Sequence, residues 1–168
     1  MKVVDDDQVR LTIRPARADD CEWLAAGAEA MAWETEHKRL DPETIRRGIA
    51  TGLADASRAR YFIAERDGVA VGTLMLTTEW SDWRNGWWWW IQSVYVPPEH
   101  RRGGVLRALY AHVHAEAVAA GGVCGLRLYV EHGNVNAQKT YESLGMEDAG
   151  YRMFEAGLPW LRDVIAKG

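Results

Sequence analysis

The stretch of sequence that decides the fold runs from Val94 to Leu109 and reads VYVPPEHRRGGVLRAL. An apolar strand ends at two prolines, and a helix begins after two arginines and two glycines. A glycine-rich turn of this kind leaves backbone N–H groups free at the helix start, where the helix dipole also favours negative charge. Arg101 and Arg102 add guanidinium donors for phosphate oxygens. The stretch therefore predicts an anion site, to which a solvated basic turn with a helix cap is the alternative.

The residues before this stretch predict strands joined by short turns. Apolar runs over 60–65 and 69–78 flank Asp67-Gly68, a dipeptide typical of a hairpin turn. A polar loop over 81–86 then leads into a long strand over 87–96. We therefore expect an antiparallel meander in the middle of the chain. That arrangement does not suit a dinucleotide fingerprint, which needs a βαβ unit, and the P-loop motif is absent from the sequence.

Further elements are expected on both sides of the meander. Glu34 to His37 interrupts an apolar helical pattern and predicts a loop, and Asp41-Pro42 is typical of a helix start. No repeat or linker divides the chain, so we expect one α/β domain over 1–168 with a mixed sheet. The remaining predicted elements are strands over 8–14, 123–130 and 151–156, and helices over about 19–31, 41–52, 104–119 and 136–144.

The bulk composition narrows the class of protein. The chain is 48% hydrophobic and 26% charged, as in ordinary globular proteins, and its net charge of −4 gives no reason to expect nucleic-acid binding. Residues 1–7 are acidic and no apolar run is long enough to cross a bilayer, so we expect neither a signal peptide nor membrane association. Cys21 and Cys124 lack disulfide or metal spacing, and a cytoplasmic location is the default. His112 and His114 point to different sides of a helix, so we expect no metal.

Two segments resemble the signature of the GNAT superfamily of N-acetyltransferases. In that family P-x-x-R/Q-x-x-G-x-G/A opens a helix that binds the CoA pyrophosphate. Arg101 matches the Arg/Gln position and Gly104 the central glycine, whereas Leu106 stands where a small residue is usual. Residues 134–146, NVNAQKTYESLGM, are similar to the family's N-x-x-A-x-x-x-Y-E-x-L-G-F, with methionine in the last position. The resemblance covers about residues 8–156. It implies an α/β (α+β) fold with a mixed, mostly antiparallel central sheet of six to seven strands and about four helices.

The resemblance also implies an activity. Acetyl would pass directly from acetyl-CoA, a co-substrate used without a metal, to a primary amine of a small molecule or peptide in a ternary complex. The alternatives are a protein N-terminal or lysine acetyltransferase, and a catalytically silent acyl-CoA-binding module. Tyr141 would protonate the departing sulfur, and the backbone N–H of Val94 would hold the oxyanion. The implied CoA-binding residues are Val94, Tyr95, Val96, Arg101, Arg102, Gly103, Gly104, Val105, Leu106, Arg107, Asn134, Asn136, Lys139 and Tyr141.

Each of the side chains in the second segment also has a plain structural interpretation. Tyr141 could simply pack under its helix, Asn134 could be a turn residue, and Lys139 could be a solvated lysine. The general base has no fixed position in the family. Glu34, Glu36 and Glu79, the last at the end of a central strand, are candidates, and Gln92 with Ser93 could orient a water instead.

Tryptophan is unusually frequent, with nine in the chain and six of them between Trp80 and Trp90. One interpretation is packing of the sheet together with burial in a homodimer. The other is an aromatic wall that binds an amine acceptor by cation–π contact. In the second interpretation Trp33, Trp80 and Trp83 line part of the acceptor site with Glu34, Glu36 and Gln92. The carboxylates would attract a cationic amine.

Overall fold

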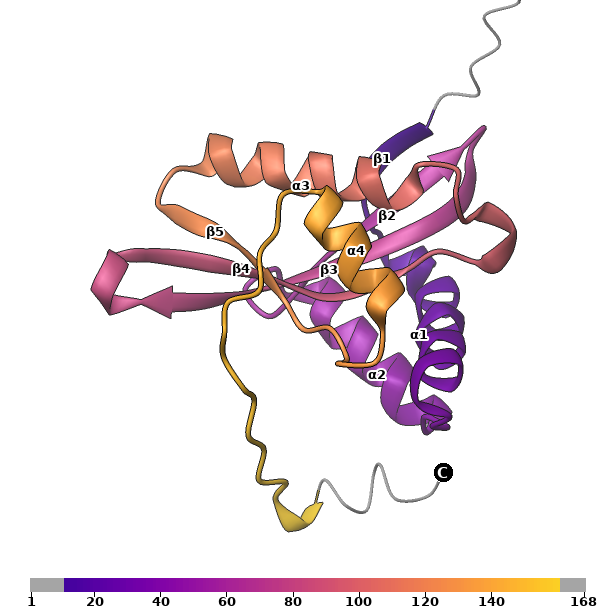
Figure 1. The fold of residues 1–168 in the computed structure, drawn as a ribbon. Coiled ribbons are helices and arrows are strands. Elements are labelled where there is room, and N and C mark those ends of the chain that lie inside the picture. Colours follow the sequence, from indigo (N-terminus) through magenta and orange to yellow (C-terminus); the bar gives the residue numbers. More distant parts are fainter. Residues whose placement is uncertain (1–10, 161–168) are drawn as a thin grey trace, which may run out of the picture.

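The computed structural model describes residues 11–160, which form a five-stranded sheet with helices on both faces (Figure 1). The strands are β1 (Leu11–Pro15), β2 (Arg60–Arg66), β3 (Val69–Ser81), β4 (Gly86–Tyr95) and β5 (Val123–Leu128). Their order across the sheet is β1-β2-β3-β4-β5. The first four pair antiparallel, and β2 to β4 form the antiparallel meander that the sequence predicted, whereas β5 runs parallel to β4. Residues 8–10 of the predicted first strand lie outside the described residues.

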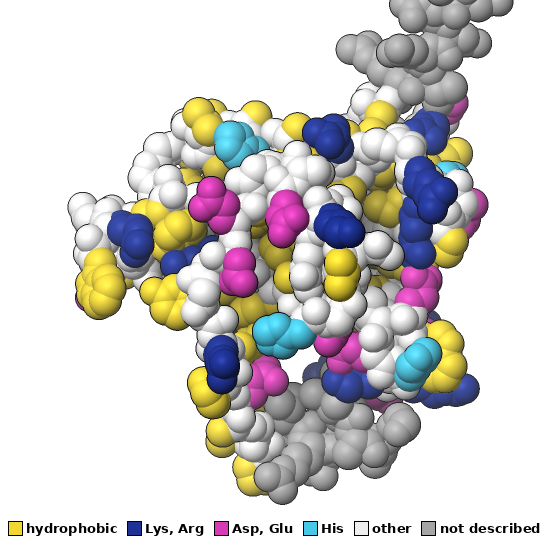
Figure 2. Space-filling view, in the orientation of Figure 1, with side chains coloured by type: hydrophobic (Ala, Val, Ile, Leu, Met, Phe, Trp, Pro, Cys, Tyr) yellow, Lys and Arg dark blue, Asp and Glu magenta, His cyan; other side chains and the backbone are white. Residues whose placement is uncertain are grey.

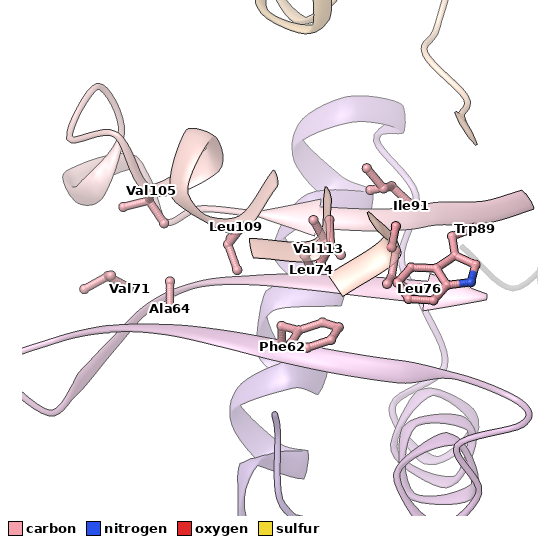
Figure 3. Packing of buried hydrophobic residues seen from close by; sticks show 11 residues of the cluster. Phe62, Ala64, Val71, Leu74, Leu76, Trp89, Ile91, Val105, Leu109 and Val113 are labelled. Atoms are coloured by element: carbon pink, nitrogen blue, oxygen red, sulfur yellow. The ribbon is translucent and has the colours of Figure 1, made fainter. Parts of the chain in front are cut away.

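The helices divide between the two faces of the sheet. The pair α1 (Cys21–Glu36) and α2 (Pro42–Ala54) packs through Leu24 and Ile49 on Ile63 of β2. On the other face α3 (Val105–Ala120) buries Leu109 and Val113 over Leu74 of β3 (Figure 3). Because neighbouring strand residues point to opposite faces, β2 contributes to the cores on both sides of the sheet, with Ile63 on the side of α1 and α2 and Phe62 on the side of α3. A fourth helix, α4 (Val135–Ser143), follows β5 and buries no residue fully.

Local signals in the sequence account for the element boundaries. Asp67 and Gly68 have φ of 53° and 77°, as a two-residue hairpin turn with the twist of the flanking strands requires. The Asp41 side chain accepts a hydrogen bond from Thr44 N at 2.8 Å and caps α2. No helix of the described residues is long and apolar enough to span a membrane.

The loop predicted over Glu34 to His37 is wrong. The first helix continues to Glu36, and His37 caps it in a left-handed conformation, with φ of 52°. The His37 N–H bonds to Trp33 O, and Lys38 N–H bonds to Ala32 O. These bonds satisfy carbonyls of the last turn, so the helix runs on although its apolar pattern has stopped.

The expected six to seven strands are also corrected, because the described residues contain five. The missing strand is the one predicted over 151–156, which is extended but has no neighbouring strand and is exposed throughout. Tyr151 is 84% and Phe154 91% exposed. An apolar alternating pattern makes a strand only where a sheet edge and a core receive it, and here neither does. The expectation of about four helices is confirmed, since α1 to α4 are the α-helices that lie wholly within residues 11–160.

Candidate active site

The sheet opens between β4 and β5. Their pairing ends at Ile91 with Leu128, whereas β4 continues to Tyr95 and stays paired with β3 on its other side. Gln92 is the extra residue of a bulge, because Met75 pairs with Ser93 and Leu76 pairs with Ile91. Beyond the bulge, the edge of β4 that faces away from β3 has no strand partner. Val94 and Tyr95 lie on this open edge.

The turn between β4 and α3 holds a run of free donors. Within residues 11–160, the backbone N–H groups from Arg102 to Arg107 have no hydrogen-bond partner. Arg102 has φ of 63° and Gly104 has φ of 77°. Left-handed residues at alternate positions curve the backbone into a concave nest of N–H groups, which binds anions. The macrodipole of the long α3 helix adds to that preference.

Packing fixes where this nest lies. Val105, the first residue of α3, is buried in the core. A Cβ added at Gly72 of β3 would lie 2.5 Å from the Val105 side chain and 3.4 Å from Tyr95 O, so only glycine lets the helix start approach the sheet this closely. The nest therefore sits at the end of β4, next to the opening between β4 and β5.

Arg101 ties the turn to two other elements. Its Nε donates to Val96 O at 2.9 Å, and its Nη2 pairs with Glu34 Oε2 of α1 at 2.5 Å. Tyr95 Oη lies 3.4 Å from the other oxygen of Glu34. Arg101, Arg102 and Arg107 are all exposed. Figure 2 shows basic side chains gathered on the side of the molecule where this turn lies.

The second segment singled out in the sequence forms α4. Asn134 is its N-cap and accepts from Ala137 N at 3.1 Å, and Gln138 Nε2 donates to Glu131 O and His132 O beyond β5. Tyr141 is partly buried, and this burial raises the pKa of its hydroxyl above the ordinary value of 10.0. Asn136 and Lys139 are exposed.

The sheet face on the side of α1 and α2 carries a polar and aromatic cluster beside the opening. Arg127 of β5 lies 3.9 Å from the Trp88 ring centre and donates to Glu79 Oε1 at 3.1 Å. The other oxygen of Glu79 accepts from Trp90 Nε1, and Trp90 stacks on Tyr129 with ring centres 4.5 Å apart. Gln92 lies on β4, as Trp88 and Trp90 do, and its Nε2 donates to Thr77 Oγ1 at 2.8 Å. Arg127, Trp88, Trp90 and Tyr129 were missed by sequence reasoning; polar Arg127 between Leu126 and Leu128 was a usable signal.

The structure does not bring the expected acceptor residues together. Trp80 stacks edge-on against Trp87, and Trp83 is 88% exposed at the tip of the β3–β4 hairpin. Trp87 is eight positions before Tyr95, which lies on the open edge of β4, and eight strand residues span about 26 Å, so the hairpin tip lies far from that edge. Trp33 belongs to α1, which lies at the other end of the sheet from that tip (Figure 1).

Chain cations already accompany the three carboxylates expected to serve an acceptor. Glu34 pairs with Arg101, Glu36 with Lys38, and Glu79 with Arg127. Arg39 lies 5.4 Å from the Trp33 ring centre and Arg127 covers Trp88, so cation–π positions are occupied as well. Among the described residues, no group of three or more His, Cys, Asp or Glu side chains is placed to hold a metal ion.

Comparisons with known proteins agree on one family. The model of the acetyltransferase (GNAT) family matches residues 19–146. A crystal structure of a possible acetyltransferase from Clostridium difficile 630 is 40% identical, with 88% of this chain and 97% of that chain covered and a TM-score of 0.83. No curated protein sequence matches significantly.

More distant structures share the fold. An aminoglycoside N-acetyltransferase in complex with CoA is 18% identical over 92% of this chain and 99% of its own, with a TM-score of 0.75. A ribosomal-protein-alanine N-acetyltransferase from Brucella melitensis biovar Abortus 2308 is 17% identical over 89% of this chain and 100% of its own, with a TM-score of 0.69.

Proposed function

The chain belongs to the GNAT family of acetyltransferases, and from this premise we propose that it transfers acetyl from acetyl-CoA directly to a primary amine of a small molecule or peptide. The observation that carries the proposal is the nest of free N–H groups from Arg102 to Arg107 beside the opening between β4 and β5. Both lie where one extended molecule with a phosphorylated end can reach them. Acetyl-CoA has that shape and charge.

Acetyl-CoA would be held at two places. The nest, with the side chains of Arg102 and Arg107, receives the pyrophosphate, since free N–H groups and guanidinium groups are donors that suit phosphate oxygens. The open edge of β4 at Val94 and Tyr95, with Val96 directly after the strand, pairs with the amide groups of the pantetheine arm, as a neighbouring strand would. Asn134, Asn136 and Lys139 contribute from α4. Leucine at position 106 keeps the backbone N–H that the nest needs.

The residues at the opening supply the chemistry of transfer. The amine nitrogen attacks the thioester carbonyl carbon, and the N–H of Val94 stabilises the oxyanion that forms. When the carbon–sulfur bond breaks, the Tyr141 hydroxyl gives its proton to the thiolate. Burial raises the pKa of Tyr141, so the hydroxyl stays protonated and able to donate near neutral pH.

Two groups are proposed for removing the proton from the amine. Glu79 is hydrogen-bonded to Trp90 and Arg127, next to the last paired residues of β4 and β5, and must release one of them before an oxygen is free to accept a proton. Gln92 and Ser93 at the bulge could instead hold a water that carries the proton away. We favour Glu79 as the residue to test first, because its carboxylate is itself a base.

The acceptor is proposed to be a small amine. The cations beside Glu34, Glu36 and Glu79 leave little free negative charge at the site, so a polycationic acceptor gains less than the sequence suggested. Gln92, at the bulge of β4 beside the opening, remains a proposed acceptor contact, and Trp33 of α1 is proposed as a second one, whereas Trp80 and Trp83 lie far along the hairpin. We also infer a reducing, cytoplasmic setting, since Cys21 and Cys124 are free thiols.

A thiol-release assay with acetyl-CoA and a panel of amines tests the proposal. The panel should hold an aromatic amine, an aliphatic amine, an aminoglycoside, a peptide with a free N-terminus and a lysine peptide blocked at its N-terminus. Amine-dependent release of CoA thiol supports the proposal, and the preferred amine separates small-molecule from protein acetylation. Binding of CoA with no turnover on any amine favours the silent module. Absence of CoA binding contradicts both.

A further inference from the structure

We propose that Arg66 is a positioning residue for the pyrophosphate turn and aims one of its backbone donors. Arg66 is the last residue of β2, and its side chain reaches across to the turn before α3. Its Nη2 donates to Gly103 O at 2.9 Å. A Cβ added at Gly103 would lie 3.0 Å from Nη2 and 3.3 Å from Nη1, so the guanidinium lies directly against the glycine backbone. No pattern in the sequence marks this contact.

Because of the geometry of the peptide bond, this contact also fixes the direction of a neighbouring backbone N–H group. The peptide that joins Gly103 and Gly104 is planar and trans, so its C=O and N–H point in opposite directions. Since Arg66 holds the C=O, the N–H of Gly104 is directed away from Arg66. That N–H is one of the free donors of the nest.

This peptide needs an outside constraint more than any other in the turn. Glycine on both sides allows it to rotate through backbone conformations closed to other residues. Each rotation would carry the Gly104 N–H out of the nest and turn a carbonyl oxygen toward the bound phosphate. One hydrogen bond from the partly buried Arg66 guanidinium removes that freedom before the ligand arrives.

The positive charge of Arg66 offers a simpler explanation for any effect on phosphate binding. Within residues 11–160 it makes no ion pair with a carboxylate, and its Nε is buried without a hydrogen-bond partner. The charge alone would attract phosphate from nearby. The two explanations predict different results for Arg66→Lys. Lysine keeps the charge but lacks the planar guanidinium that lies against Gly103, so it preserves CoA affinity only if charge alone acts.

The experiment measures the affinity for CoA and for pantetheine, which lacks the pyrophosphate, by calorimetry. The inference rests on the proposed function, so the unaltered protein must first bind CoA. We expect Arg66→Ala to raise the Kd for CoA about tenfold, as for loss of one oriented hydrogen bond to an ionised group, with no change for pantetheine. Arg66→Lys should not restore the affinity. The control is Arg47→Ala, an exposed arginine of α2.

Each other result overturns the inference in a recognisable way. An unchanged Kd for CoA in Arg66→Ala removes the role altogether, provided that the unaltered protein binds CoA. Full recovery in Arg66→Lys shows that charge alone acts. An equal loss for pantetheine, with a lowered Tm, shows a general effect on the fold. If the unaltered protein binds no CoA, the proposed function fails and the inference falls with it.

Discussion

At the Tyr141 hydroxyl, burial is the one cause of the raised pKa, and no charged neighbour contributes. Desolvation disfavours the phenolate, so the hydroxyl keeps its proton up to a higher pH than a free tyrosine. The contribution of Tyr141 to stability is therefore present below pH 10 and is lost as the pH rises above about 10, where the unfolded chain releases this proton more readily. A proton donor of this kind stays in its active form throughout the neutral range.

We predict that Tyr141→Phe lowers kcat about 100-fold, the lower end of the range for general acids, and leaves the KM for acetyl-CoA nearly unchanged. Phenylalanine keeps the buried ring and removes the proton donor. Steady-state rates of the two proteins at saturating acetyl-CoA check this. Tyr151→Phe, at an exposed tyrosine, is the control. Equal kcat values would assign Tyr141 to packing.

Glu79 shows how a single carboxylate can be tied to its neighbours. Both of its oxygens accept hydrogen bonds, one from Arg127 and one from Trp90. We predict that Glu79→Gln lowers kcat by at least about 100-fold if Glu79 is the base, since an amide cannot take the proton. Glu43→Gln on α2 is the control, and an unchanged kcat in Glu79→Gln would point to a water at Gln92 and Ser93.

At the scale of the elements, two arginines connect segments that are far apart in the sequence. Arg101 joins the turn before α3 to α1, and Arg14 joins β1 to β2 and to the segment before α1. Arg14 donates to Asp20 and Glu65, and its bond to Asp20 is the largest cause of the lowered pKa of that carboxyl. Asp20 therefore stabilises the fold above pH 3.8, and that contribution is lost as the pH falls below this value.

We predict that Asp20→Asn lowers the stability at pH 7 by about 1–2 kcal/mol, which for a domain of this size lowers Tm by several degrees. At pH 3 the difference from the unaltered protein should shrink, because the carboxyl is then largely protonated in the unfolded chain. Thermal unfolding at the two pH values checks this. Asp19→Asn, one residue away and exposed, should have little effect. An equal difference at both pH values would contradict the ion-pair explanation.

At the scale of the whole molecule, the described residues expose two apolar regions. The β3–β4 hairpin exposes Trp80, Trp83 and Trp87, and the C-terminal segment exposes Tyr151 and Phe154. We propose that a second copy of the chain covers the hairpin, since large exposed aromatic groups are costly to leave in water. The homodimer interpretation of the tryptophan cluster therefore stays a proposal, now attached to the hairpin tip.

We predict that light scattering of the purified protein gives twice the chain mass of 18.9 kDa. Trp83→Asp should convert it to a monomer, because an unpaired carboxylate in an apolar interface is costly. Val118→Asp, on an exposed position of α3, should leave the dimer intact. A monomer at all concentrations would show that the hairpin tryptophans serve something other than self-association.

Much of the fold could be predicted from the sequence because its signals are local. The hairpin at Asp67-Gly68, the cap at Asp41 and the glycine turn before α3 each depend on a few neighbouring residues. The two errors were at boundaries set from a distance. Nothing near Glu36 shows that the helix ends only at His37, and the alternation over 151–156 does not show that the edge of β5 stays unpaired.

The sequence by itself determined the family, the order of the elements and the glycine-rich turn before α3, because motif spacing and glycine positions are written along the chain. Only the tertiary structure decided which cation stands beside each carboxylate, that Arg66 lies against Gly103, and that Trp83 is far from Trp33. These facts depend on contacts between residues dozens of positions apart. Strand register and helix packing create those contacts, and no local pattern records them.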